Sequence, residues 1–131
     1  MALALADAGV QPRDLAHINA HGTSTVLNDR AEAAALTTLL GGSCPPVTAV
    51  KGSTGHMIAG SGAVEAIVSL IALRHRLVPP VAGLRTIDPE FGLDVVQGTP
   101  RHVPPGYALS NSFGFGGANT ALVLAAWGSA G

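Results

Sequence analysis

The feature that most constrains the fold is a segment whose apolar side chains point in every direction around a helix axis. Residues 63–76 follow Gly60-Ser61-Gly62 and favour a helix that has no polar stripe. A helix of this kind is buried on all sides. A single sheet with helices on its outside cannot bury such a helix within 131 residues. We therefore expect this helix to lie between two layers, one of which another chain supplies.

The low charge of the chain also indicates a covered surface. Charged residues make up 11% of the sequence, whereas an ordinary soluble domain has roughly 25%. The longest apolar run, residues 63–73, contains Glu65 and Ser69 and is shorter than the roughly 20 residues of a membrane span, so we expect no membrane association. The net charge is −1 with scattered basic residues, which argues against nucleic-acid binding.

The cysteine content and the N-terminus favour a cytoplasmic protein. No basic segment precedes the apolar N-terminus, so we expect no signal peptide. The single cysteine, Cys44, forms no internal disulfide, which fits a reducing compartment. No neighbouring residue activates its thiol, so we do not expect a nucleophile there. His17 and His21 with one cysteine do not make a zinc site, and we expect no bound metal.

The order of helical and extended segments predicts an α/β fold with a mixed sheet of about five strands, in one domain over residues 1–131. Asp29 and Glu32 have the spacing of a capping box at the start of the second helix. Helices are expected at 1–8, 29–40 and 63–76, and strands at 15–20, 46–50, 93–96, 107–110 and 120–126.

Three loops that follow predicted strands carry the chemistry of the chain. They are His21-Gly22-Thr23-Ser24-Thr25, Lys51-Gly52-Ser53-Thr54-Gly55-His56 and Asn111-Ser112-Phe113-Gly114-Phe115-Gly116-Gly117. Together they deliver two imidazoles, one ammonium and a glycine-rich backbone, a set that suits the stabilisation of a developing negative charge. No cysteine or serine stands in a recognisable nucleophile setting. The chain therefore resembles half of an active site.

Each loop also has a purely structural interpretation. His21 suits a hydrogen-bonded tight loop, and the glycine-rich segment suits a wide hairpin bend. Lys51 is the only lysine and stands between a buried strand and a buried helix. We expect it to pair with Glu65, because an unpaired carboxylate in an apolar helix is costly. That ion pair can anchor the loop and serve the chemistry at the same time.

Taken together, these motifs resemble the C-terminal half of β-ketoacyl-acyl carrier protein synthases, the condensing enzymes of the thiolase-like superfamily. The resemblance covers about residues 3–124 and includes the segments 19–25, 51–56, 60–65 and 111–119. It implies half of a five-layered αβαβα sandwich in which the helix at 63–76 is the central helix. The nucleophilic cysteine of the family belongs to the other half, and Cys44 does not match it.

The resemblance also implies roles for individual residues. His21 and His56 match the two active-site histidines, and Lys51 matches the lysine that organises the second histidine, with Glu65 as its carboxylate partner. Phe115 matches a backbone N–H donor of an oxyanion hole. The remaining residues that match family positions are Thr23 and Thr25 at the phosphopantetheine arm, Phe113, Gly114 and Gly116 in a gating loop, and Asn119 in support. Val26 stands where the family often has proline.

The resemblance implies a split ketosynthase subunit that condenses malonyl and acyl thioesters only with a cysteine-bearing N-terminal half. Its further partner is the acyl carrier protein, whose phosphopantetheine carries the substrates, and no separate cofactor is expected. A heteromer with two copies of each half is expected. The position of Met1 before the first helix favours a designed boundary. Two alternatives stay open: a non-condensing subunit that binds, cyclises or isomerises acyl groups, and a structural partner of the chain-length-determining type.

Overall fold

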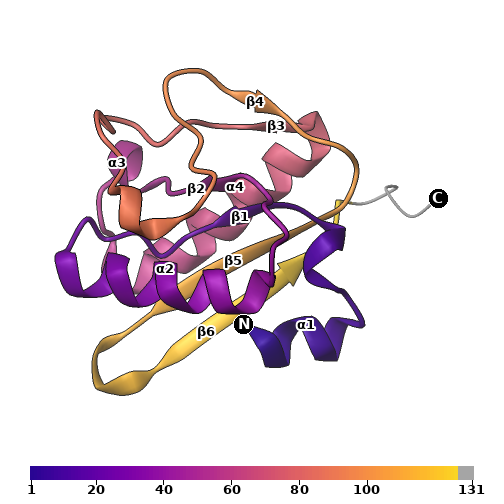
Figure 1. The fold of residues 1–131 in the computed structure, drawn as a ribbon, viewed down its shortest axis with the longest axis horizontal. Helices are drawn as coiled ribbons and strands as arrows, with labels where there is room; N and C mark the ends of the chain where they lie inside the picture. Colours follow the sequence, from indigo (N-terminus) through magenta and orange to yellow (C-terminus); the bar gives the residue numbers. More distant parts are fainter. Residues whose placement is uncertain (127–131) are drawn as a thin grey trace.

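The computed structural model describes residues 1–126, which form a layered α/β unit (Figure 1). One sheet has the strand order β2-β1-β5-β6. In it, β1 runs parallel to both β2 and β5, while β6 is antiparallel to β5, so the sheet is mixed as predicted. Its strands are β1 (Leu15–Asn19), β2 (Val47–Thr48), β5 (Tyr107–Phe113) and β6 (Asn119–Leu124).

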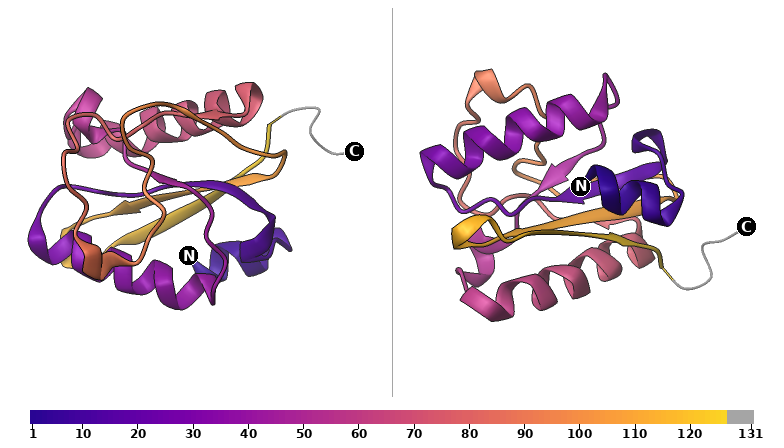
Figure 2. Two further views of the ribbon diagram at one scale, coloured as in Figure 1. Left: turned by 45° about the horizontal axis from the view of Figure 1, so that its top comes forward. Right: turned by 90° about the horizontal axis from the view of Figure 1, so that it is seen from below.

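Helices cover both faces of this sheet. The helices are α1 (Ala2–Ala8), α2 (Val26–Leu40), the single turn α3 (Lys51–Thr54) and α4 (Ser61–His75). α1 and α2 lie on one face and α4 lies on the other (Figure 2). The α2 face buries Leu36 against Ile18 and Leu109 of the sheet. The α4 face buries Leu73 with Ala16 and Ala108. Each face therefore has its own apolar core.

The start of α2 differs from the sequence-based expectation. The helix begins at Val26 after an extended Thr25, one turn before Asp29. The Asp29–Glu32 capping box is therefore wrong, because both residues already lie inside the helix. The predicted ends are confirmed: Gly9 and Gly41 adopt left-handed conformations after α1 and α2, where glycine avoids the steric cost of a Cβ atom.

The predicted strands shift in length at the sheet edges. The expected strand at 46–50 shortens to Val47–Thr48 because Val50 takes a helical conformation as the N-cap of α3. The expected strand at 93–96 forms a single parallel bridge between Val95 and Val47. A separate antiparallel pair, β3 (Leu77–Val78) with β4 (Arg101–His102), was not predicted. Two-residue strands carry too short a pattern to be recognised in a sequence.

The helix α4 has one buried and one exposed face. Towards the sheet it buries Glu65, Ser69 and Leu73, while Ile67 and Ile71 are more than half exposed. No segment within residues 1–126 buries these two side chains, so a second covering layer stays a prediction. By length and composition the segment Ile58–His75 is apolar enough to cross a membrane. The core helix of a soluble protein passes the same test, and Glu65 within it is paired with Lys51.

His17 gives the fold a pH-dependent stability. Its ring lies fully buried in β1, and neither ring nitrogen has a hydrogen-bond partner within residues 1–126. Burial lowers the pKa of His17 from 6.5 to about 4. In the unfolded chain His17 takes up a proton below about pH 6.5, whereas in the folded chain it stays neutral until about pH 4. The free energy of unfolding therefore falls as the pH drops through this window.

We expect this single group to remove about 3 kcal/mol of folding free energy between pH 6.5 and pH 4. The variant His17→Leu should lose this part of the pH dependence. Urea denaturation of both proteins at several pH values measures the difference. An identical pH dependence in the two proteins would contradict the assignment.

Candidate active site

His21 lies directly after β1, in a loop that leads into α2. Its backbone N–H donates to Glu32 Oε1 at 2.8 Å, and the N–H of Gly22 donates to Glu32 Oε2 at 3.0 Å. Gly22 has a φ of +46°, and a Cβ atom there would lie 2.6 Å from the Cβ of Ala49. Both the left-handed backbone and the lack of space therefore require glycine after the histidine.

Glu32 is a site residue that the sequence analysis missed. Its side chain is buried, and besides the His21 loop it accepts a hydrogen bond from Asn111 Nδ2 in β5 at 3.0 Å. One carboxylate from α2 thus ties together the loop after β1 and the strand β5. In the sequence, the spacing between Asp29 and Glu32 suggested a cap of their own helix. The partners of Glu32 include Gly22 and Asn111, which are 10 and 79 residues away, and nothing in the local sequence indicated them.

We expect the variant Glu32→Gln to lower the free energy of unfolding by about 1–3 kcal/mol. An amide NH2 would replace one carboxylate oxygen that now faces buried N–H donors, so one donor loses its acceptor. Chemical denaturation measures the change. The matched control is Glu90→Gln, whose side chain is 77% exposed and should change stability by no more than about 0.5 kcal/mol. Equal effects at both positions would contradict the role of Glu32.

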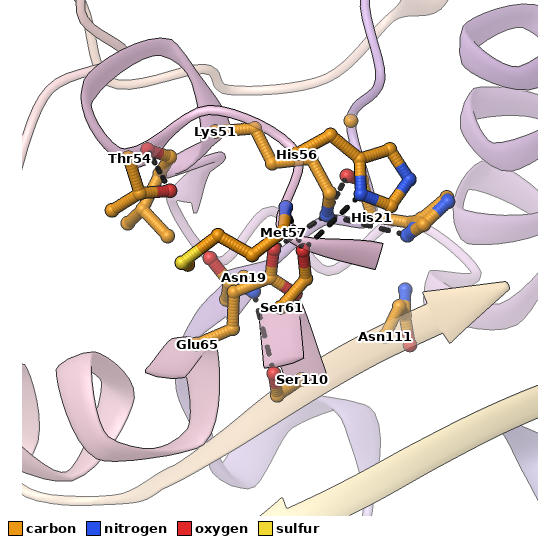
Figure 3. A network of polar contacts seen from close by, with 12 residues as sticks. Asn19, His21, Lys51, Thr54, His56, Met57, Ser61, Glu65, Ser110 and Asn111 are labelled. Carbon is orange, nitrogen blue, oxygen red and sulfur yellow. Dashed lines mark hydrogen bonds and ion pairs between the residues drawn. The ribbon is translucent and has the colours of Figure 1, made fainter. Parts of the chain in front are cut away.

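Lys51 is the first residue of α3, and its ammonium group is buried beneath the His21 loop (Figure 3). Lys51 Nζ lies 2.5 Å from Glu65 Oε1, so the predicted ion pair is confirmed. The same Nζ donates to the backbone oxygen of His21 at 2.5 Å and lies 3.3 Å from His21 Nδ1. The expectation that Lys51 organises the second histidine is wrong in this respect: within the described residues its imidazole contact is with His21.

The position of Lys51 sets the protonation of His21. An ammonium group can only donate hydrogen bonds, so His21 Nδ1 accepts and the ring proton lies on Nε2. The pKa of His21 is lowered to about 4, first by burial and then by the charges of Lys51 and His56. The imidazole of His21 is therefore neutral at pH 7.

His56 follows α3 and lies beside His21. The two rings meet edge to face, with centroids 5.6 Å apart. His56 Nδ1 accepts the backbone N–H of Ile58 at 3.1 Å and lies 3.2 Å from Ser61 Oγ. Ile58 has a left-handed backbone with φ of 53°, which costs a β-branched residue about 1–3 kcal/mol. Within residues 1–126 no hydrogen bond is made by the Nε2 atom of either histidine.

The glycine-rich loop closes the same end of the sheet. Phe113, at the end of β5, places its ring 5.4 Å from the His21 ring. Phe115 begins a short 3-10 turn, Phe115–Gly117, with a fully exposed side chain. Gly114 donates its N–H to the Ala118 oxygen at 2.7 Å, and Gly116 adopts a left-handed backbone. This loop is a hairpin bend, as its structural interpretation predicted.

The other predicted site residues lie around this centre. Thr23 Oγ1 and Thr25 Oγ1 form a hydrogen bond of 2.8 Å with each other. Asn119 is exposed at the start of β6, opposite Phe113. Cys44 is exposed in the loop before β2. In the described part of the chain, no group of three or more His, Cys, Asp or Glu side chains is placed to hold a metal ion.

Similar solved structures include ketosynthases, which places the chain in the thiolase-like class of α/β proteins. The ishigamide ketosynthase/chain length factor superposes with a TM-score of 0.92 at 37% identity, over 97% of this chain and 32% of that one. A type II polyketide synthase acyl-carrier protein in complex with its ketosynthase gives 0.90 at 33% identity, over 95% and 31%. A β-ketoacyl synthase from Burkholderia phymatum gives 0.89 at 36% identity, over 94% and 30%.

The chain belongs to the β-ketoacyl synthase family, because residues 1–85 match the model of its C-terminal domain. The 3-oxoacyl-[acyl-carrier-protein] synthase 2 of Mycobacterium tuberculosis is 47% identical over 117 residues, 89% of this chain. The protein of the same name from Synechocystis is 44% identical over 126 residues, 95% of this chain. The chain spans 28% and 30% of the lengths of these two relatives. The predicted family is thus confirmed.

Proposed function

We propose that this chain supplies the two histidines of a β-ketoacyl-acyl carrier protein synthase for decarboxylative condensation. The observation that carries the proposal is the pair of adjacent imidazoles, His21 and His56. Both direct Nδ1 at donors inside the protein, and within residues 1–126 neither uses Nε2. Two N–H groups are therefore available for an oxygen atom that gains negative charge.

In the proposed reaction, the cysteine thiolate of a ketosynthase N-terminal half attacks an acyl thioester and releases the carrier thiol. A malonyl thioester then binds, and the Nε2–H groups of His21 and His56 hydrogen-bond its thioester oxygen as carbon dioxide leaves. The resulting enolate attacks the enzyme-bound acyl thioester, and the cysteine thiolate departs. The backbone N–H of Phe115 contributes to the oxyanion hole for this second step. Neutral imidazoles suit these roles, because they stabilise an enolate without protonating it.

The remaining residues support this chemistry in the proposal. Lys51 and Glu65 position His21. Thr23 and Thr25 meet the phosphopantetheine arm of the carrier protein, and the arm is the only prosthetic group required. The other proposed contributors are Phe113, Gly114 and Gly116 as a gate, and Asn119 in support of the gating loop.

The partner of the chain in this proposal is a ketosynthase N-terminal half that carries the cysteine. The exposed apolar face of α4, with Ile67, Leu70 and Ile71, gives that half a surface to cover. Burial of such a face is favourable by about 25 cal/mol per Å². We propose a cytoplasmic heteromer with two copies of each half that receives its substrates from an acyl carrier protein.

Reconstitution tests the function directly. The full chain is combined with a separately expressed N-terminal half of a β-ketoacyl synthase, and product formation from acyl and malonyl carrier thioesters is followed by mass spectrometry. We expect a stable complex and condensation that requires both chains. Decarboxylation or acyl transfer without condensation would favour a non-condensing subunit. A complex without either reaction would favour a structural partner, a possibility suggested by the ketosynthase/chain length factor among the similar structures.

A further inference from the structure

A buried serine lies next to His56 and has no role in the scheme above. Ser61 is the first residue of α4, and only 3% of its surface is exposed. Its Oγ accepts the backbone N–H of Met57 at 2.9 Å and lies 3.2 Å from His56 Nδ1 (Figure 3). The serine thus contacts both the ring and the turn that follows it.

The direction of the Ser61–His56 hydrogen bond follows from the neighbouring backbone. The N–H of Ile58 points at the same Nδ1 atom, at 3.1 Å. A backbone N–H can only donate, so Nδ1 carries a lone pair and the ring proton lies on Nε2. Ser61 must therefore donate its hydroxyl proton to Nδ1 while its lone pair accepts the N–H of Met57. Hydrogen bonds arranged in such a chain strengthen one another.

The Ile58 donor alone is a weak support for the ring. Ile58 is held in a left-handed conformation that is unfavourable for a β-branched residue, and the residue is 78% exposed. Packing of the Ile58 side chain in this chain therefore does little to maintain the turn. Ser61, by contrast, is anchored in α4 and holds the turn through Met57. The buried hydroxyl therefore links the ring of His56 to the start of α4.

We propose that Ser61 is a positioning residue that holds His56 in the tautomer with its proton on Nε2. This assignment rests on the proposed function for its use in the reaction, since the Nε2–H group is the one offered to the thioester oxygen. The tautomer itself is a property of the free chain. It can therefore be measured without any substrate or partner.

Nitrogen NMR of the full chain with 15N-labelled histidine tests the tautomer. At pH 7.5 we expect His56 Nδ1 to have the chemical shift of an unprotonated nitrogen and Nε2 that of a protonated one, with His56→Gln identifying the signals. In Ser61→Ala both shifts should move towards each other, as the ring begins to exchange between tautomers. Ser61→Thr, which keeps the hydroxyl, should restore the separation.

Ser69→Ala is the matched control. Ser69 is an equally buried serine of α4, but it donates to the backbone oxygen of Glu65 at 2.8 Å. Its removal should leave the His56 shifts unchanged. A protonated Nδ1 in the wild-type chain would overturn the proposal whether or not any variant folds. Unchanged His56 shifts in Ser61→Ala would overturn it as well.

In the reconstituted complex, Ser61→Ala should lower kcat for malonyl decarboxylation about 2- to 12-fold, with little change in KM. This factor corresponds to the net free energy of one hydrogen bond. Ser61→Thr should rescue this loss. An unchanged kcat in Ser61→Ala would count against the positioning role. An inactive wild-type complex would instead contradict the proposed function, while the NMR result would still decide the role of Ser61.

Discussion

Lys51→Met is expected to lower the free energy of unfolding by about 3–5 kcal/mol. The variant leaves the carboxylate of Glu65 without its cation in a place where only 1% of that side chain is exposed. The other carboxylate oxygen, Oε2, has no hydrogen-bond partner within residues 1–126, so Glu65 has no second source of compensation. The backbone oxygen of His21 loses its donor in the same step.

Urea denaturation of the full chain measures this loss, and two controls define its origin. The double variant Lys51→Met/Glu65→Leu removes both charges and should recover most of the stability, because an apolar pair replaces a buried ion pair without an uncompensated charge. Arg30→Met breaks the exposed contact of Arg30 with Glu90 at 4.0 Å and should cost no more than about 1 kcal/mol. If Lys51→Met cost as little as Arg30→Met, the buried pair would not be the anchor of the loop.

His56→Ala and His21→Ala are each expected to reduce malonyl decarboxylation by about 100- to 1000-fold, the usual effect of removing one donor to a developing oxyanion. The two imidazoles are proposed to serve one oxygen, so the double variant should lose less than the product of the single effects. Release of carbon dioxide from malonyl carrier protein by the reconstituted complex gives the rates. The matched control is His75→Ala, at the exposed C-terminal end of α4, which should not change them. Full activity of either active-site variant would remove that histidine from the proposed mechanism.

The meeting of the three loops was predictable because of a general property of parallel strands. β1 and β5 are parallel neighbours, so His21, just after β1, and Phe113, at the end of β5, lie at the same edge of the sheet. The pairing of Lys51 with Glu65 was also predictable. An apolar helix that contains one carboxylate needs a cation nearby, and the chain has one lysine.

The supporting contacts could not be predicted, because they depend on tertiary structure or on an unusual backbone conformation rather than on a local sequence pattern. The sequence around Glu32 indicates only the start of a helix, and its partner Asn111 is 79 residues away. Ser61 is a single polar residue between two glycines in the sequence, and its contact with His56 forms across a turn in which Ile58 has a left-handed backbone. Such contacts follow from the completed tertiary structure and leave no periodic signal in the chain.

The shared carboxylate of Glu32 has a consequence for how the active-site end can move. Its Oε1 atom accepts both the backbone N–H of His21 and the side-chain amide of Asn111, which stands just before the glycine-rich tip of the β5–β6 hairpin. A movement of that tip that displaces Asn111 would alter the hydrogen bonding of Glu32 Oε1, the same atom that accepts the backbone N–H of His21. We therefore expect a displacement of the β5–β6 hairpin tip to shift the backbone of His21 as well.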